Sequence, residues 1–380
     1  MNAVWEWFRK IPISILLACL LISFAGLCGL YRADQLYGPS RLFERQLIWL
    51  ALAWPMMLAV TTVPYRPLKH FSPWLYVGSL VLLVIVLFMP PVNGSRRWIP
   101  LGLFDFQPSE PTRLAFILAL AHYLMYRDSQ RTVRGLLPPF VITVFPLLLI
   151  LREPDLGTAM LFLPILYAML FAGGAKPAHL IAAALIGVAV LPLLWQQMTA
   201  EQRSRVVMVF TQTDSGSAPS GDGFHLHQSK QVLALGGLWG SHLHEEPIID
   251  DPSAYLLPAA RTDFIACLIG ERYGTAGYGV LLLLYGVIVV RGLTAARRTR
   301  EPFGRLVAVG IVTMLGTQVL INLSMTVGLM PITGITLPMC SYGGSSLMST
   351  CIAMGLLMNI TMRPGYEVAG EPVWDRSGRR

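Results

Sequence analysis

The chain has 380 residues, of which 54% are hydrophobic and only 13% are charged, and its formal net charge is +8 at pH 7. Soluble domains carry about 25% charged residues, so this composition excludes an ordinary soluble protein and indicates a membrane protein. The positive charge does not require nucleic acid as a partner, because basic residues on the cytoplasmic side, next to anionic lipid, account for it.

Apolar segments long enough to cross a membrane recur along the whole chain. About 20 apolar residues in a helix span the ~30 Å hydrocarbon core of a bilayer. We therefore expect an all-α polytopic membrane protein with about ten spanning helices, arranged as a single domain over residues 1–362 with a disordered cytoplasmic tail at 363–380. The expected spans are 11–30, 46–63, 71–90, 109–126, 136–151, 157–173, 178–195, 263–290, 303–325 and 343–362.

Ten spans place both ends of the chain on one side of the membrane. Basic residues are denser on that side, with clusters such as Arg127/Arg131/Arg134. The positive-inside rule then places both termini in the cytoplasm of a multi-pass protein of the cytoplasmic membrane. The first apolar run lacks a small-residue cleavage site, which favours an uncleaved anchor. The five cysteines form no spaced motif, so neither a disulfide framework nor a cysteine metal site is expected.

Residues 196–262 form the longest polar segment and are expected on the outer face, between spans seven and eight. A structureless loop of this length is uncommon unless it is functional. The stretch "QSKQVLALGGLWG" is expected to contain a short helix at the membrane interface. Four histidines in this segment lack the spacing of known zinc motifs, so we expect a solvated loop rather than a metal site; they are His225, His227, His242 and His244.

Two acids lie at the start of the eighth apolar segment, in "LLPAARTDFIACLIGERYG". Asp263 opens the segment, and Glu271 lies about 12 Å deeper on the same broad face. Acids inside a membrane are costly and usually face a cavity or a partner. Asp263 has a second interpretation as a helix N-cap, because a Thr-Asp pair before an apolar run is typical of a helix start. Glu271 needs a partner that the neighbouring Arg272 cannot supply, since it points about 100° away.

The second outer loop, "NGSRRWIPLGLFDFQPSEPTR", concentrates positive charge where the positive-inside rule disfavours it. Arginine side chains match phosphate oxygens, so Arg96, Arg97 and Arg113 predict a pyrophosphate substrate at the outer leaflet. The alternative is a set of interfacial anchors, with Trp98 in the aromatic belt. Glu110 is either an acid of the first helical turn or a partner for Arg113.

Two further motifs contain polar or irregular sequence. In "REPDLGTA" (152–159), Asp155 is expected to cap the sixth span and so to shape the site. The passage "NLSMTVGLMPITGITLPMCSYGGSSLMST" (322–350) is interrupted by Gly and Pro. Irregular backbone at membrane depth is tolerated only where it lines a cavity or is buried in protein. We expect either a polar pocket lining or a re-entrant packing loop.

This last passage resembles the signature of the shape, elongation, division and sporulation family of cell-wall proteins. The positions that match include Asn322, Gly334, Pro338 and Ser341. The stretches "RRWIPLG…QPSE", "REPDLGTA", "SRVVMVF", "QSKQVLALGGLWG" and "TDFIACLIGERYG" match in the same order, so the resemblance covers nearly the whole chain. Departures are Ala259 in place of an acid, Arg261 in place of a histidine, and Arg113 in place of a lysine.

The resemblance implies an inverting peptidoglycan glycosyltransferase with ten spans that polymerises lipid II on the outer face of the membrane. It implies a class B penicillin-binding transpeptidase as partner, and lipid II and an undecaprenyl-pyrophosphate-linked glycan as substrates, within a cell-shape complex. It makes Asp263 the essential aspartate. The substrate-binding set then comprises Trp98, Arg96, Arg97, Arg113, Glu110 and Ser341, with Glu271 acting only indirectly. The short N-terminal tail favours the elongation type over the division type.

Glycosyl transfer requires a proton acceptor and a stabilised leaving group, and these residues can supply both. Attack by the 4-hydroxyl of lipid II needs a proton acceptor, which is Asp263, and the departing pyrophosphate needs positive charge. Asp263 could instead bind a divalent cation, Mg²⁺ or Mn²⁺. A lipid II flippase is the competing class, but it needs polar residues on both faces of the membrane. A scaffold protein would leave the acid at 263 without a purpose.

Overall fold

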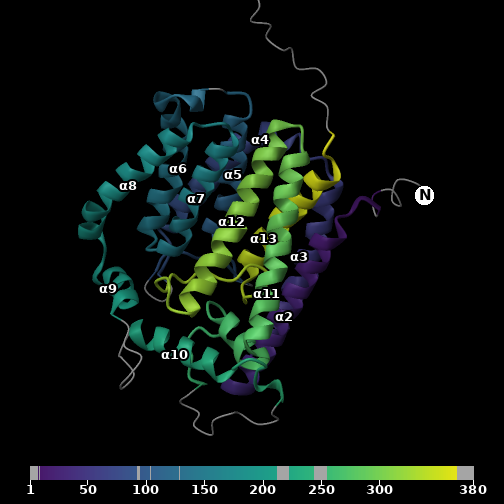
Figure 1. The fold of residues 1–380 in the computed structure, drawn as a ribbon, viewed down its shortest axis with the longest axis vertical. Coiled ribbons are helices and arrows are strands. Elements are labelled where there is room, and N and C mark those ends of the chain that lie inside the picture. The colour runs from purple at the N-terminus through teal and green to yellow at the C-terminus, as the bar shows by residue number, and fades with distance from the viewer. Residues whose placement is uncertain are drawn as a thin grey trace, which may run out of the picture.

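The computed structural model describes residues 7, 9–91, 95–102, 104–127, 129–211, 222–243 and 255–365. Within them, one helix occupies each of the ten predicted apolar segments (Figure 1). These helices are α2 (Ile13–Tyr37), α3 (Leu42–Thr62), α4 (Leu68–Val86), α5 (Ser109–Leu124), α6 (Val133–Arg152), α7 (Leu156–Ala172), α8 (Pro177–Gln197), α11 (Ile265–Arg298), α12 (Pro302–Thr326) and α13 (Gly344–Met362).

The helices have the composition of membrane spans. Six of them are long and apolar enough to cross a bilayer: α2, α4, α6, α11, α12 and α13. Large apolar side chains also face outward on the rim helices, among them Trp74 of α4, Phe145 of α6 and Leu185 of α8. A water-soluble protein seldom exposes such continuous apolar surface, whereas a lipid-facing helix must. The predicted multi-pass helical membrane fold is confirmed in this general form.

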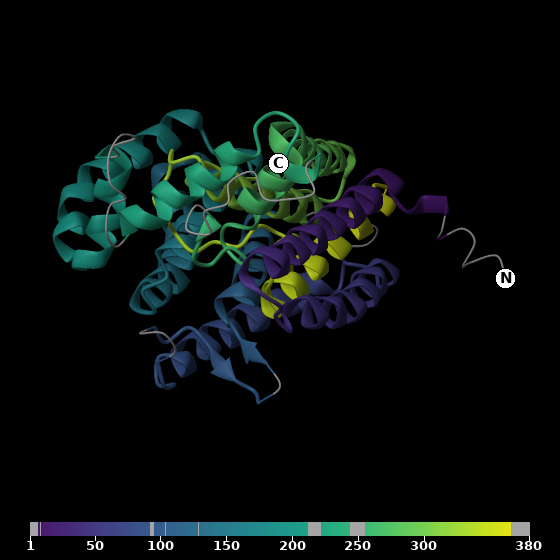
Figure 2. The ribbon, with the colours of Figure 1, turned by 90° about the horizontal axis from the view of Figure 1, so that it is seen from below.

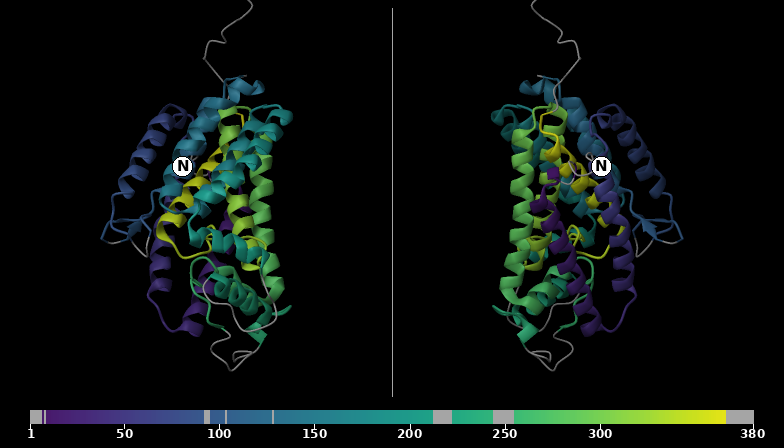
Figure 3. Two further views of the ribbon diagram at one scale, coloured as in Figure 1. Left: turned by 90° about the vertical axis from the view of Figure 1, so that its left-hand side faces the viewer. Right: turned by 90° about the vertical axis from the view of Figure 1, so that its right-hand side faces the viewer.

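Two features depart from the sequence-based prediction. The segment between α4 and α5 contains a small antiparallel hairpin, β1 (Ile99–Pro100) paired with β2 (Asp105–Phe106), so the fold is not entirely α-helical. Figures 2 and 3 show this hairpin at the rim of the molecule, beside the lower end of α4. The second departure is a break in α11 at Gly274, which has φ 69° and ψ −169°.

The break divides α11 into two parts. An unbroken helix of 34 residues would be about 51 Å long, well beyond the bilayer core. Residues 275–298 alone are sufficient to cross it. The first turns of α11, which contain Glu271, therefore form a separate short helix at the end of the bundle.

Both described ends of the chain lie at the same end of the bundle. The indole Nε1 of Trp7 donates to Thr61 Oγ1 at 3.2 Å, and Arg363 donates to the carbonyl of Thr61 at 2.9 Å. Thr61 lies in the last turn of α3, at the upper end in Figure 1. The first and last described residues therefore lie at the same end of the bundle. We call this the terminal end and the opposite one the site end.

The long polar segment contributes helices at the site end. α9 (Ala200–Phe210) begins with a capping box between Thr199 and Gln202, and α10 (Asp222–Leu235) crosses the lower end of the bundle (Figure 1). A helical turn, η2 (Ser241–Leu243), follows. The expected short helix in "QSKQVLALGGLWG" is present but ends at Leu235. His244 and residues 366–380 of the predicted tail lie outside the described residues.

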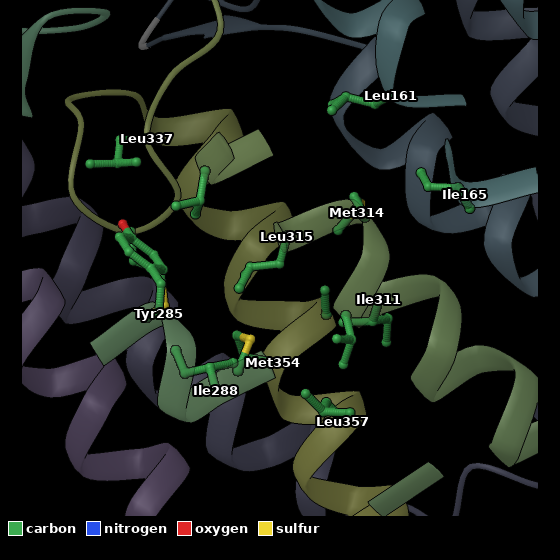
Figure 4. Close-up of a cluster of buried hydrophobic side chains, with 14 of the residues drawn as sticks. Leu161, Ile165, Tyr285, Ile288, Ile311, Met314, Leu315, Leu337, Met354 and Leu357 are labelled. Atoms are coloured by element: carbon green, nitrogen blue, oxygen red, sulfur yellow. The ribbon is translucent and has the colours of Figure 1, made fainter. Parts of the chain in front are cut away.

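The core of the bundle is centred on α12. Its side chains Ile311, Met314 and Leu315 are buried against α7, α11 and α13 (Figure 4). Tyr285 of α11 points from this core toward the non-helical segment 327–343, and its hydroxyl donates to the carbonyl of Pro338 at 2.6 Å. From Ile335 to Ser341 the segment is largely buried in protein, as irregular backbone at membrane depth must be, whereas Val327, Leu329 and Gly334 before it are exposed.

Candidate functional site

Polar side chains gather at the site end from parts of the sequence that are far apart. The hairpin brings Arg97, the start of α5 brings Gln107, and the α6–α7 turn brings Asp155. The turn before α11 brings Asp263, which faces the segment 327–343. Because buried polar groups need partners, such a gathering marks a built site rather than a random feature of the surface.

Asp263 lies in the turn that precedes α11, outside the spanning helices, and is half-buried. The N-cap of α11 is Phe264, and the helix start has no side-chain cap. The cap interpretation of Asp263 is therefore wrong. The carboxylate lies beside Gly334, where a Cβ would be 3.7 Å from its Oδ2, and Gly334 has φ 73°, which side-chain-bearing residues rarely adopt.

Several groups shift the pKa of Asp263 in opposite directions. Together they raise the pKa to about 6. Burial is the largest cause and raises it, a hydrogen bond from Thr262 lowers it, the charge of Asp155 raises it, and the charges of Arg97 and Arg205 lower it. A carboxylate with such a pKa is a stronger base than an ordinary aspartate but is still mostly ionised at pH 7. This combination suits a general base.

Asp155 has the predicted capping role and a wider one. Its Oδ1 accepts from the backbone N–H of Thr158 at 3.1 Å, which confirms the cap of α7. Its Oδ2 accepts from Gln107 at 3.3 Å, and Arg97 approaches Oδ1 at 3.9 Å. Asp155 thus joins three elements next to Asp263 and is a site residue that the motif alone presented only as a cap.

The three predicted arginines have separate sets of partners. Arg97 donates through Nε to the carbonyl of Glu153 at 3.0 Å and also to the carbonyl of Pro154, so it fastens the hairpin to the α6–α7 turn. Arg96 is exposed and donates to the carbonyl of Leu87 at 2.9 Å. Of these two, Arg97 is the one whose charge acts on Asp263.

Arg113 is enclosed in the protein with only 2% of its surface exposed. It forms an ion pair with Glu110 one turn earlier and donates to Gln318 of α12 at 3.0 Å. Gln318 in turn donates to the carbonyl of Thr336 at 2.9 Å. The predicted Glu110–Arg113 pairing is therefore present, and it links α5 to the segment 327–343.

Glu271 has a partner that lies 239 residues away in sequence. Arg32 of α2 donates to both carboxylate oxygens, at 2.8 Å and 2.6 Å, and to Ser241 of η2 at 3.3 Å. Glu271 is fully buried and Arg32 is 8% exposed. The carboxylate is thus engaged in joining α2, η2 and the first part of α11, which agrees with an indirect role.

Ser341 and Trp98 complete the predicted set. The hydroxyl of Ser341 donates to the carbonyl of Thr262 at 2.6 Å and accepts from the N–H of Leu337 at 2.8 Å, so both of these bonds are made within the protein. Trp98 is half-buried next to β1. Ser341 lies directly beside the turn that contains Asp263, whereas Trp98 belongs to the hairpin that carries Arg97.

Three residues of the site end had no predicted role in the site, although Asn322 was among the signature matches. Glu153 is fully buried beside Arg97, and Arg205 of α9 acts electrostatically on Asp263. Asn322 of α12 donates to the carbonyl of Asp263 at 2.9 Å. A signal for Asn322 existed: a buried amide inside an apolar helix must find partners, and Gln318 lies one turn earlier on the same face.

A divalent cation finds no ready set of ligands here. In the part of the chain that the structure describes, no group of three or more His, Cys, Asp or Glu side chains is arranged to hold a metal. Of these side chains Mg²⁺ and Mn²⁺ prefer the carboxylates, with water and substrate phosphate as further oxygen ligands. We therefore derive no step through a metal ion.

The fold and the site together define a class: a multi-pass helical membrane protein with a half-buried aspartate and supporting buried polar residues at the end of the bundle opposite its termini. The chain belongs to the FtsW/RodA/SpoVE family, described as cell cycle proteins, whose profile matches residues 10–365. The family resemblance predicted from the signature motifs is confirmed.

Relatives and solved structures agree with this assignment. The chain is 33% identical to the probable peptidoglycan glycosyltransferase FtsW of Geobacter sulfurreducens, over 93% of this chain and 96% of that protein. It is 32% identical to the peptidoglycan glycosyltransferase MrdB of Escherichia coli, over 94% of each. A chain in a solved peptidoglycan synthase complex has 29% identity and a TM-score of 0.79, with 94% of this chain and 99% of that chain covered.

Proposed function

We propose that the protein is a peptidoglycan glycosyltransferase that polymerises lipid II into glycan strands on the outer face of the cytoplasmic membrane. The observation that carries the proposal is Asp263, a half-buried carboxylate whose pKa is raised to about 6 and which lies next to the charges of Arg97, Arg205 and Asp155. Relatives of 32–33% identity carry this activity in their names.

Asp263 is the proposed general base. It takes the proton from the 4-hydroxyl of the lipid II acceptor as that oxygen bonds to the anomeric carbon of the glycan donor. The bond from this carbon to the donor's undecaprenyl pyrophosphate then breaks, and the configuration inverts. At pH 7 a group with a pKa of about 6 is ionised in roughly nine of ten molecules. Asp263 is therefore more basic than an ordinary aspartate and still mostly in the deprotonated form that a general base requires.

Arg97 is the proposed contact for the departing pyrophosphate. Its guanidinium is anchored on the carbonyl groups of Glu153 and Pro154, and its charge reaches Asp263. A fixed cation stabilises the negative charge that develops on the leaving group. Arg96 and Trp98 lie on the same hairpin and are proposed to contact the substrate at its edge. Arg113, Glu110 and Ser341 are proposed to support the site from within the protein.

The proposed orientation has ten crossings, the site end outside and both termini in the cytoplasm. Arg131 before α6 and Arg134 in the first turn of α6 are exposed at the terminal end, as the positive-inside rule requires of the cytoplasmic side. A lipid-linked substrate in the outer leaflet then meets Asp263 near the membrane surface.

We further propose a class B penicillin-binding transpeptidase as the partner. The similar chain in a solved peptidoglycan synthase complex supports it, since that complex is described as coordinating polymerization and crosslinking. The identities to FtsW and to MrdB, 33% and 32%, are too close to separate division from elongation. Rescue of bacterial strains depleted of one or the other relative would assign the role.

The decisive experiment compares two isosteric changes in purified protein with labelled lipid II, with and without the transpeptidase. Asp263→Asn should reduce glycan synthesis by at least about 10²-fold, because general-base catalysis typically contributes 10²–10⁴-fold. Asp105→Asn, an exposed aspartate on the hairpin at the same end, should leave it unchanged. A near wild-type rate for Asp263→Asn would contradict the base assignment. Wild-type protein that moves lipid II between leaflets without polymerising it would support the flippase class instead.

A further inference from the structure

Three consecutive backbone carbonyls around Asp263 are held by groups from distant parts of the chain. The carbonyl of Arg261 accepts from the N–H of Tyr342 at 3.1 Å, and the carbonyl of Thr262 accepts from Ser341 Oγ at 2.6 Å. The carbonyl of Asp263 itself accepts from Asn322 Nδ2 at 2.9 Å. These donors come from α12 and from the segment that precedes α13.

Asn322 connects two parts of the site with one amide group. Its Nδ2 donates to Asp263 O and also to Ile335 O at 2.7 Å. The residue is fully buried, and its Oδ1 has no hydrogen-bond donor within the described ranges. The nitrogen of this amide makes two hydrogen bonds and its oxygen makes none. The two donated bonds are therefore what the polar side chain contributes to the fold.

Local hydrogen bonds alone do not fix the conformation of the turn at 259–264. The N–H groups of Thr262, Asp263 and Phe264 all approach the single carbonyl of Ala259, which has φ 54° although it is not glycine. A non-glycine residue in this region is strained and persists only when its surroundings impose it. Bonds from outside the turn therefore decide where Asp263 lies.

We propose that Asn322 and Ser341 are positioning residues, which hold the backbone on both sides of Asp263 so that its carboxylate stays beside Gly334 and in reach of the attacking hydroxyl. This inference rests on the proposed catalytic role of Asp263. The two residues act through the turn and do not touch the reacting atoms. Both fall within the signature segment, and the inference gives that segment a physical purpose.

Release of the turn would also change the proton affinity of Asp263. The charged groups that act on it are Asp155 at the start of α7, Arg97 of the hairpin and Arg205 of α9. Burial is the main cause of its raised pKa, so a turn that relaxes toward water lowers the pKa toward the ordinary value of about 4. The acid limb of the pH–rate profile would then move below pH 6.

The test is Asn322→Ala in full-length protein with its transpeptidase, with lipid II polymerisation followed from pH 5 to 8. We expect the plateau rate to fall by about 10²-fold, because a displacement of about 1 Å costs that much, and the acid limb to move to lower pH. The KM for lipid II should stay within about twofold. Folding should survive, since the change also removes the unpartnered Oδ1.

Asn359→Ala is the matched control. Asn359 is equally buried, and its Nδ2 likewise donates to two carbonyls, those of Val60 and Val63, but at the terminal end. It should lose thermal stability without changing the pH profile. An independent pair covers the case in which Asn322→Ala does not fold: Ser341→Ala should shift the acid limb, and Ser341→Thr, which keeps the hydroxyl, should restore it.

An acid limb at the wild-type pH in both Asn322→Ala and Ser341→Ala would overturn the positioning role. This result is distinct from failure of the proposed function. If wild-type protein polymerises lipid II and Asp263→Asn does not, the function stands and only the positioning role is lost. If wild-type protein makes no glycan, the proposed function fails before the positioning question arises.

Discussion

Glu153 is a carboxyl group whose surroundings favour its neutral, protonated form. It is fully buried at the α6–α7 turn, and its two oxygens have no hydrogen-bond donor in the described part of the chain. Its pKa is raised to about 9, chiefly by burial and also by the charge of Asp155, while the charge of Arg97 acts to lower it. Glu153 is therefore neutral at pH 7, while Asp155, which caps α7 and receives Gln107, carries the local negative charge.

The raised pKa of Glu153 leads to a prediction about stability. The folded protein keeps this proton up to about pH 9, whereas the unfolded chain loses it near pH 4, so stability from this group is present at low pH and declines as pH rises across that window. Glu153→Gln removes the decline. We expect the apparent Tm of the variant to exceed that of wild type by a margin that grows from pH 5 to pH 9, measured by light scattering in detergent. A margin independent of pH would show that Glu153 is ionised in the fold.

The break in α11 is the structural element that shapes the site end. At Gly274 the helix opens, and the freed N–H groups of Thr275 and Ala276 donate to the carbonyls of Gly237 and Leu238, at 2.9 Å and 3.2 Å. A Cβ on Gly274 would lie 2.3 Å from the carbonyl oxygen of Leu238. The "GGLWG" turn thus replaces the helical bonds that the break removes.

Gly274→Ala should detach the "GGLWG" turn from α11. The left-handed backbone costs about 1–3 kcal/mol for a residue with a side chain, and the overlap with Leu238 adds to it. We expect a clearly lower apparent Tm and faster proteolysis within residues 222–243. Gly286→Ala, in the same helix with nothing within 4 Å of the added Cβ, should be neutral or slightly stabilising. Equal melting of the two variants would rule out the docking role of Gly274.

The Arg32–Glu271 pair makes a second prediction at this scale. Removal of one partner leaves an uncompensated buried charge, so Glu271→Ala or Arg32→Ala should cost about 3–5 kcal/mol. The double change Arg32→Met with Glu271→Leu replaces both charges with apolar side chains and should recover most of the stability. Polymerisation activity should recover with it. A double variant that is stable but inactive would mean that Glu271 contacts the substrate.

At the scale of the whole molecule, the arrangement predicts which loops face the outside. Asp105 on the hairpin and Arg134 in the first turn of α6 are both exposed, at opposite ends of the bundle. In spheroplasts, Asp105→Cys should react with a membrane-impermeant maleimide, and Arg134→Cys should react only after permeabilisation. The native cysteines give a low background because four are buried; Cys28, which is partly exposed, is replaced by Ser in the parent. The reverse labelling pattern would invert the proposed orientation.

The sequence alone determined the parts of this protein that depend on local composition. Apolar runs predicted a helix in each of ten segments, six of which are long and apolar enough to cross a membrane, because a helix in lipid satisfies its backbone within itself and its length must match the bilayer. The cap at Asp155 and the irregular segment after α12 were likewise readable, since capping and Gly/Pro interruption are short-range effects. Asp263 stood out because an acid at the edge of an apolar run is costly.

Only the tertiary structure decided which of these residues meet. Glu271 pairs with Arg32 across 239 positions, and three arginines that looked like one cluster have three sets of partners. Asn322 reaches the carbonyl of Asp263 from a helix that begins 39 residues later. Such contacts depend on how helices dock and where α11 breaks. No local pattern encodes them, because hydrogen bonds between distant segments form only after packing has brought those segments together.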